Sequence, residues 1–446
     1  MQKDLTNGSI VGNVLRFSIP FFISSFLQTM YGIVDLFIIG QFNGADTIAA
    51  VSSGGQIMHM VTVVIIGLAM GTTILLSRAV GAKDEKRIAN IIGNTVILFL
   101  IVSILLTSAL IVFNSSLVKW IQTPVESVEQ TKSYLLICFI GIPFIVAYNV
   151  ISSVFRGLGD TKSPMYFIAA AGVVNIILDY ILIGKLGMGA AGAALGTALS
   201  QTFSVVFSLL YIKKKSLGIT VKRKDFALQQ KMAKELLRIG APIAVQDGLI
   251  QVSFLIITAI ANGRGVDVAA AVGIVEKIIG FLFLVPSAMS SAVSAISAQN
   301  VGANLHGRAK KTLWYACGIT FGVGMVFSIL CQWVSPRVVG WFTDEPLIIQ
   351  LGAQYLRAYV FDCAIAGIHF CFSGYFCAYQ YAYLSFLHNI ASIILMRIPG
   401  AYFASVWFPE TLFPMGMAAP LGSLLSVMIC YGMYLWLRKR QGRNYS

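Results

Sequence analysis

Long apolar runs separated by short polar turns occupy almost the whole chain. A helix needs about 20 mostly apolar residues to cross the hydrocarbon of a bilayer, and twelve runs approach or exceed this length. The first six are Val14–Gly40, Met60–Ser77, Ile91–Phe113, Tyr134–Phe155, Pro164–Ile183 and Ala190–Ile212. The second six are Ile239–Ala261, Ala269–Ala298, Thr312–Val334, Ile348–Phe376, Tyr383–Trp407 and Met415–Leu437. The pattern predicts an all-α integral membrane protein with about twelve transmembrane helices.

The composition supports this class. Of the 446 residues, 57% are hydrophobic and only 11% are charged, whereas a soluble domain has about 25% charged residues. The start, "MQKDLTNGSIVGNVLRFSIP", lacks a short apolar core followed by a cleavage site. It is interpreted as a polar tail that enters the first span. The seven cysteines lie in apolar segments without metal-binding spacing and are expected to be buried packing residues.

The net charge of +14 comes from basic residues gathered in alternate breaks between spans. The basic breaks hold 20 lysines and arginines, around Arg78–Arg87, Lys213–Arg238, Arg308–Lys311 and Arg438–Arg443. The other breaks hold only Lys119, Lys132, Lys185, Arg264 and Arg337. Because positive charge concentrates on the cytoplasmic side, we expect a multi-pass protein of the plasma (inner) membrane with both termini cytoplasmic. The charge is thereby explained without a nucleic-acid partner.

The chain also repeats itself. "LRFSIPFFISS" resembles "LRIGAPIAVQD", "SRAVGAKDEKRIAN" resembles "AQNVGANLHGRAKK", and "GAALGTALSQ" resembles "AAPLGSLLSV". Each half has six spans, an even number, so the repeats are parallel. The predicted organisation is an amino-terminal lobe over residues 1–212, a basic cytoplasmic linker over 213–234, and a carboxy-terminal lobe over 235–446. Duplicated bundles of this kind are typical of secondary transporters with a site near the bilayer midplane.

Motifs for other functions are missing from the sequence. It contains no GxxxxGK[ST] phosphate loop, no HExxH or GxSxG motif and no filter-like loop of a potassium channel. His59, His369 and His388 stand in separate spans without motif spacing, and core histidines are the favoured interpretation. We therefore expect neither an enzyme nor a cofactor, and uphill transport would need an ion gradient.

Five acids interrupt the apolar spans. A charged side chain at the bilayer centre costs about 2.5–3.5 kcal/mol on insertion scales, so each should face a cavity, a partner or a cation. They are Asp35, Asp179, Asp247, Glu276 and Asp362.

Three of these acids have an alternative structural explanation. Glu276 stands next to Lys277, Asp362 follows Arg357 by five residues, and Asp247 follows Gln246 near a helix start. Asp35 and Asp179 have no basic residue within a turn or two. An isolated buried acid is either protonated or holds a cation.

Helical spacing adds ligands to Asp179. Asn175 and Asp179 are four residues apart, as are Ala193 and Thr197, so each pair shares one helix face. The glycines and alanines of "GMGAAGAALG" allow the two helices to approach closely. Carboxylate, amide, hydroxyl and carbonyl oxygens together suit a hard cation such as Na⁺, while a proton needs only the carboxylates. Asp179 capped merely by Asn175 is the competing structural explanation.

The second half lacks both of these acids. Ile257 stands at the position of Asp35, and "RIPGAY" (Arg397–Tyr402) stands around that of Asp179. This asymmetry indicates that one half holds the ion site and the other is specialised differently.

These segments resemble the multidrug and toxic compound extrusion (MATE) family of the multidrug/oligosaccharidyl-lipid/polysaccharide flippase superfamily, over essentially the full chain. The resemblance is carried by "IPFFISSFLQTMYGIVDLFIIG", "SRAVGAKDEKR", "FRGLGDTKSPMYF", "NIILDYILIGKLGMGAAGAALGTALSQ" and "VGANLHGRAKK". It implies a V-shaped pair of six-helix lobes, mostly monomeric, that exports cationic or amphipathic compounds in exchange for Na⁺ or H⁺.

The resemblance also implies a cation site in the amino-terminal lobe. Its members correspond to Asp35, Asn175, Asp179, Thr197 and a backbone carbonyl at Ala193. An acid of the seventh helix in many members corresponds to Asp247 or Gln251. Further candidates for the substrate cleft are Gln28, Tyr31, Gln246, Glu276, Met289 and Asp362.

A flippase for lipids or lipid-linked sugars of the same superfamily is the alternative function. It would need basic residues in its cleft to hold phosphate, and Lys277, Arg357 and Arg397 are the only ones near the second-half spans. The acids are the more prominent set, so the antiporter is favoured.

Overall fold

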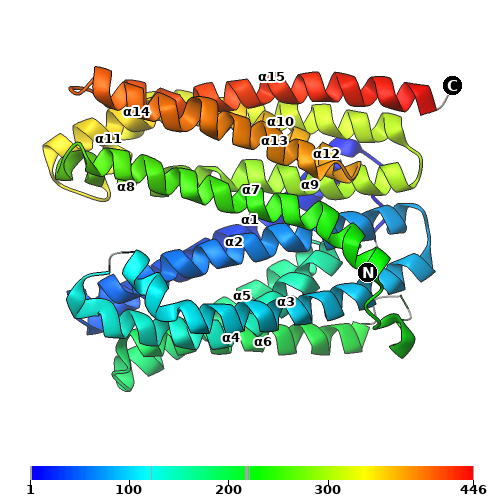
Figure 1. Ribbon diagram of the computed structural model, residues 1–446, viewed down its shortest axis with the longest axis horizontal. Helices are drawn as coiled ribbons and strands as arrows, with labels where there is room; N and C mark the ends of the chain where they lie inside the picture. The colour runs from blue at the N-terminus through cyan, green and yellow to red at the C-terminus, as the bar shows by residue number, and fades with distance from the viewer. Residues whose placement is uncertain (1–2, 122, 216–218, 220, 445–446) are drawn as a thin grey trace. The chain divides into compact units, whose positions relative to one another are not determined.

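The computed structural model describes residues 3–121, 123–215, 219 and 221–444, and all regular structure in them is helical. The first half contains α1 (Ile10–Phe42), α2 (Ala45–Gly81), α3 (Glu85–Trp120), η1 (Val125–Ser127), α4 (Val128–Gly157), α5 (Lys162–Asp179), η2 (Tyr180–Lys185) and α6 (Gly189–Lys215). The second contains η3 (Arg223–Asp225), α7 (Gln230–Asn262), α8 (Val266–Leu282), α9 (Leu284–Gly302), α10 (His306–Gly340), α11 (Pro346–Tyr359), α12 (Phe361–Ala378), α13 (Ala382–Ser392), η4 (Ile393–Arg397), α14 (Ile398–Trp407) and α15 (Phe413–Asn444). Figure 1 shows them in chain order.

Twelve stretches of the described residues are long and apolar enough to span a membrane, which confirms the predicted fold class. The second span begins at Ala45, well before the predicted Met60, because its first turns are helical although they carry Ser, Gly and Gln. Two spans are interrupted within their length. α8 and α9 divide at Phe283, and α11 and α12 divide at Val360, each pair forming one predicted span.

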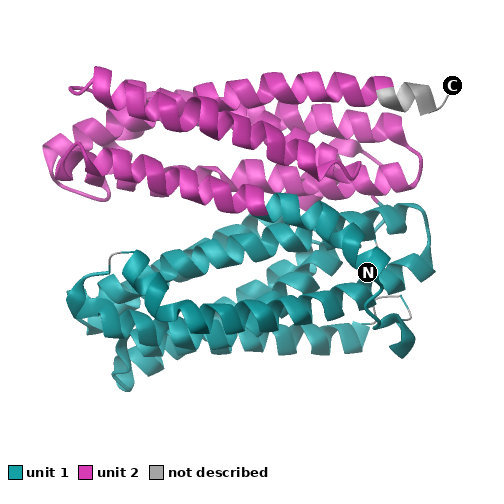
Figure 2. Cartoon of the chain, in the orientation of Figure 1, with its two compact units in different colours: residues 1–4, 19–244 teal, residues 5–18, 245–446 magenta. Residues whose placement is uncertain are grey.

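The chain forms two compact units, which Figure 2 colours separately. Unit 1 contains residues 1–4 and 19–244, and unit 2 contains residues 5–18 and 245–446. α1 and α7 therefore each contribute to both units. The boundary between the two units lies beside Pro20 in α1 and Pro242 in α7. At these positions proline removes one backbone hydrogen bond from the helix. These units group residues by packing, and the lobe boundaries at 212 and 235 remain predictions from the repeat.

Unit 1 holds the start of α7 through polar and close backbone contacts. The Gln229 N–H donates to Asn94 Oδ1 at 2.6 Å, and Arg87 pairs with Glu235 at 3.1 Å. Gly71 and Gly240 bring α2 and α7 together so closely that a Cβ on either would overlap backbone of the other helix. The apolar core of this unit is centred on α2 and α4, with Leu135 and Phe139 fully buried.

Unit 2 holds the start of α1 in a corresponding way. The Leu5 N–H donates to Gln299 Oε1 at 3.0 Å, and Arg308 donates to the Asn7 carbonyl at 2.9 Å. Val14 and Phe17 enter an apolar cluster with α9, α10, α12 and α15. Each unit thus incorporates the segment that precedes the first proline of a repeat.

Candidate functional site

The candidate cation site lies within unit 1, where α1, α5 and α6 meet. α1 carries Asp35, a buried residue that is only 6% exposed. Thr197 of α6 donates its hydroxyl to Asp35 Oδ2 at 3.3 Å. Two residues that are far apart in the sequence therefore meet here.

Asp179 ends α5 and is completely buried. One turn earlier on the same face, Asn175 donates its amide to Asp179 Oδ2 at 3.3 Å. The chain then continues as the π-helical stretch η2. π-helical turns are rare in proteins, and those that occur are often found at functional sites. The spacing of four residues between Asn175 and Asp179 thus gives a direct contact.

The two carboxyl groups lie close enough to each other to interact electrostatically. Among the residues that the structure describes, neither forms an ion pair with a basic side chain. Two buried carboxylates in contact cannot both stay charged without compensation. The pair must therefore share a proton or enclose a cation.

Several oxygens of the site are left without a donor. Asp35 Oδ1, Asn175 Oδ1 and Asp179 Oδ1 are buried and accept no hydrogen bond from any residue within the described part of the chain. Buried polar atoms in native proteins are nearly always satisfied by protein, water or an ion. Together with the Thr197 hydroxyl they form an oxygen set, which is the ligand type that hard cations prefer. The residues present therefore fit Na⁺ as well as a proton.

α6 approaches this set closely through Gly196. A Cβ at this position would overlap Asp179 Oδ1 and lie 3.7 Å from Asn175 Nδ2. Gly196 directly precedes the predicted ligand Thr197, and the glycines and alanines of "GAALGT" are the sequence signal of this close helix contact. Ala193, one turn earlier, is buried in the apolar cluster of unit 1. Its role as a carbonyl ligand remains a prediction.

Gly196→Ala is expected to displace the Asp179 carboxyl group and impair cation binding while the helices stay folded. Overpacking of this kind costs about 1–3 kcal/mol. Thermal unfolding and cation binding of the purified variant would measure both effects. Gly55→Ala is the matched control, because nothing lies within 4 Å of a Cβ there. Unchanged cation binding in Gly196→Ala would contradict the close contact.

The candidates for the substrate cleft in unit 1 occupy different surroundings. Tyr31 donates its hydroxyl to the Ile168 carbonyl and packs its ring against Gly172. Gln28 lines a small pocket of about 30 Å³. Ser24, Asn149 and the buried Arg156 line it too. This pocket is separate from the carboxyl pair, since neither acid lines it.

The candidates in unit 2 do not form one site. Ser385 donates to Gln246 Oε1 at 2.7 Å, and the Gln246 amide reaches the neighbouring Asp247 at 3.5 Å. Glu276 accepts a hydrogen bond from Thr258 at 3.0 Å. Gln251 is half-buried, and Met289 is buried in an apolar cluster.

Asp362 pairs with Arg397, a partner that its sequence neighbours do not indicate. Its carboxylate lies 2.7 Å from Nη2 of Arg397 in η4, rather than pairing with Arg357 in α11. In the sequence Asp362 and Arg397 stand in separate spans, and only the packing of the helices shows that they meet. The nearby histidines are engaged in the core, with His369 and His388 bound to serine hydroxyls.

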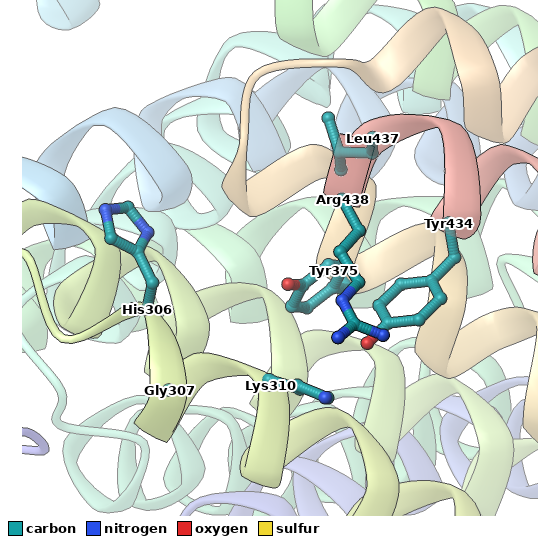
Figure 3. A pocket seen from close by; sticks show the side chains of 7 residues that line it. All are labelled: His306, Gly307, Lys310, Tyr375, Tyr434, Leu437 and Arg438. Atoms are coloured by element: carbon teal, nitrogen blue, oxygen red, sulfur yellow. The ribbon is translucent and has the colours of Figure 1, made fainter. Parts of the chain in front are cut away.

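A larger pocket of about 170 Å³ lies in unit 2, at the start of α10 and near the end of α15 (Figure 3). Its lining consists of His306, Gly307, Lys310, Tyr375, Tyr434, Leu437 and Arg438. It contains no acidic side chain and none of the predicted site residues. A cation would find no carboxylate there, so the carboxyl pair of unit 1 remains the candidate site.

Twelve membrane-length apolar helical stretches within the described residues, together with the repeat in the sequence, are the architecture of a polytopic membrane transporter. The MatE family model matches residues 20–181 and 242–403, which is well over half of the chain and covers both repeats. The chain belongs to the MatE family, whose transporters include the MATE proteins.

Curated relatives match the chain over most of its length. It is 29% identical to the probable multidrug resistance protein YpnP of Bacillus subtilis, covering 91% of each chain. It is 25% identical to the multidrug export protein MepA of Staphylococcus aureus, covering 81% of this chain and 80% of that one. A solved MATE structure in complex with MaL6 superimposes with a TM-score of 0.90 at 22% identity, covering 98% of this chain and 97% of the other. This structural likeness confirms the fold.

Proposed function

We propose that this protein is a secondary active antiporter that exports cationic or amphipathic compounds in exchange for Na⁺ or H⁺. The observation that carries the proposal is the buried, uncompensated carboxyl pair of Asp35 and Asp179. A pair that needs a proton or a cation can respond to either gradient. The names of the relatives as multidrug resistance and export proteins support the substrate class.

The residues have distinct roles in this proposal. Asp35 and Asp179 supply the negative charge, while Asn175 and Thr197 orient the carboxylates through their contacts at 3.3 Å. α6 approaches the pair closely at Gly196, where a Cβ would overlap Asp179 Oδ1. Because the acids come from α1 and from the junction of α5 and η2, cation release would remove the attraction that holds these helices together.

Alternating access follows if the coupling ion binds the two conformations with different affinity, since only differential binding shifts a conformational equilibrium. Binding of the ion to the pair would favour one arrangement, and its release would favour the other. No catalytic step and no resident cofactor enter this cycle. The proposed partners are the small exported compounds and the lipid bilayer, with the protein acting as a monomer.

The proposed location is the plasma (inner) membrane, with both termini in the cytoplasm. The basic residues between alternate spans support this orientation, since such loops remain on the cytoplasmic side. The central segment between α6 and α7 would then also be cytoplasmic.

Proteoliposomes that contain an ethidium-like cation would test the proposal. Na⁺ and pH gradients are imposed separately, and dye movement is followed by fluorescence. Uphill transport driven by one gradient and absent without it is expected. Movement that ignores both gradients would contradict the antiporter, and transport of a lipid-linked substrate in its place would indicate the flippase.

A further inference from the structure

Unit 2 buries an ion pair between Asp362 of α12 and Arg397 of η4. The Arg397 and Asp362 side chains are 10% and 0% exposed, and Nη2 lies 2.7 Å from Oδ2. The guanidinium also lies over the Phe254 ring, 5.8 Å from its centroid. A buried ion pair is weak evidence for stability, because desolvation offsets much of the attraction. Its position in the repeat indicates a different role.

Arg397 stands at the repeat position of the cation site. The two matched halves, residues 20–181 and 242–403, begin and end 222 residues apart, so Arg397 stands at or beside the position of Asn175. By the same spacing Ile257 corresponds to Asp35. Unit 2 thus has an arginine where unit 1 has a neutral ligand, and an apolar residue where unit 1 has an acid.

The last helix of each repeat approaches this position closely through a glycine. The segments "GAALGTALSQ" and "AAPLGSLLSV" align Gly196 with Gly422 and Thr197 with Ser423. A Cβ on Gly422 would lie 2.9 Å from Arg397 Cγ, just as one on Gly196 would meet Asp179. Ser423 lies close to the Asp362 carboxylate, and its hydroxyl is 3.3 Å from His369 Nε2.

A π-helical stretch adjoins each place, although the two stretches do not occupy corresponding positions of the repeat. η2 begins directly after Asp179, and η4 ends at Arg397. The carboxylate differs in origin, since Asp362 comes from α12 whereas unit 1 draws its acids from α1 and α5. The guanidinium therefore lies among groups that correspond to the cation site, paired with an acid supplied from another helix.

We propose that Arg397 is a built-in cation, whose guanidinium fills the unit 2 counterpart of the cation site and keeps exchangeable cations away from Asp362. The inference rests on the proposed cation-coupled function. Arginine remains charged in proteins, and a tethered cation cannot be released to either side of a membrane. Asp362 is thereby compensated in every state, so it takes up no coupling ion.

Removing the guanidinium should expose a second cation site. Arg397→Asn leaves Asp362 buried without a countercharge and places an amide where unit 1 has Asn175. Breaking a buried pair in this way leaves a charge that a mobile cation can compensate. Ser423 and the backbone near Gly422 would supply further oxygens.

Binding of radioactive Na⁺ to the purified full-length protein would test this at mildly alkaline pH, with choline replacing Na⁺ at constant ionic strength. The Asp179→Asn background removes the unit 1 contribution. There Arg397→Asn and Arg397→Ala are expected to gain one Na⁺ per protein, and adding Asp362→Asn should abolish the gain. Arg357→Ala is the matched control, because Arg357 forms no ion pair among the described residues.

Folded variants that gain no Na⁺, or a gain that survives Asp362→Asn, would overturn the proposal. Failure of both Arg397 variants to fold in either salt would also count against it, since Na⁺ should then replace the missing charge. The failure of this inference can be distinguished from the failure of the proposed transport function. That function fails when wild-type protein shows no gradient-driven export, whereas this inference fails on the binding of the Arg397 variants.

Discussion

Asp179→Asn is expected to reduce ion-driven export to the background rate of protein-free vesicles. Asp179 is completely buried and contacts both Asn175 and Asp35, so asparagine preserves its shape and removes its charge. Without that charge Asp35 is the only acid of the site. The site then no longer carries two negative charges that must share a proton or enclose a cation. Dye export from proteoliposomes under an imposed Na⁺ or pH gradient measures the effect, and Asp35→Asn should give the same loss.

The control for this experiment is Asp267→Asn. Asp267 lies in the first turn of α8 and is exposed, so its replacement should leave export unchanged. Dye binding without a gradient should persist in Asp179→Asn, which separates loss of coupling from loss of folding. Full gradient-driven export by Asp179→Asn would refute the assignment of the site.

Breaking the Asp362–Arg397 pair is expected to give the largest loss of stability in the protein. Removing one partner of a buried ion pair typically costs about 3–5 kcal/mol, because the other charge stays buried and uncompensated. We expect Asp362→Asn and Arg397→Leu each to lower the unfolding temperature strongly in detergent. The double variant should recover much of that loss, since neither charge remains.

A double-mutant cycle on unfolding free energy measures this coupling. The exposed pair of Lys132 and Glu129, three residues apart on α4 at 2.7 Å, is the control and should show coupling near zero. Additive losses at Asp362 and Arg397 would mean that the two side chains do not compensate each other. Choline should replace Na⁺ in these measurements, so that no mobile cation stabilises the single variants.

Local patterns account for the part of the structure that the sequence predicted. Membrane-length apolar runs gave the twelve spans because a bilayer requires continuous apolar helix surface whatever the neighbours are. The contact between Asn175 and Asp179 followed from helical spacing, which places residues four apart on one face. The start of the second span was missed because polar and glycine residues there are helical without being apolar.

Tertiary packing decided the rest. Helical periodicity places a residue on a face of its own helix but does not say which other helix that face meets. The structure was needed to bring Gly196 against Asp179, and to pair Asp362 with Arg397 rather than with Arg357. It also divided α1 and α7 between the two units near their prolines. The sequence by itself therefore determined the class of protein and the acids that interrupt its spans. Which acids pair with each other and which is compensated by an arginine depends on long-range packing, because buried charges are balanced in space and not along the chain.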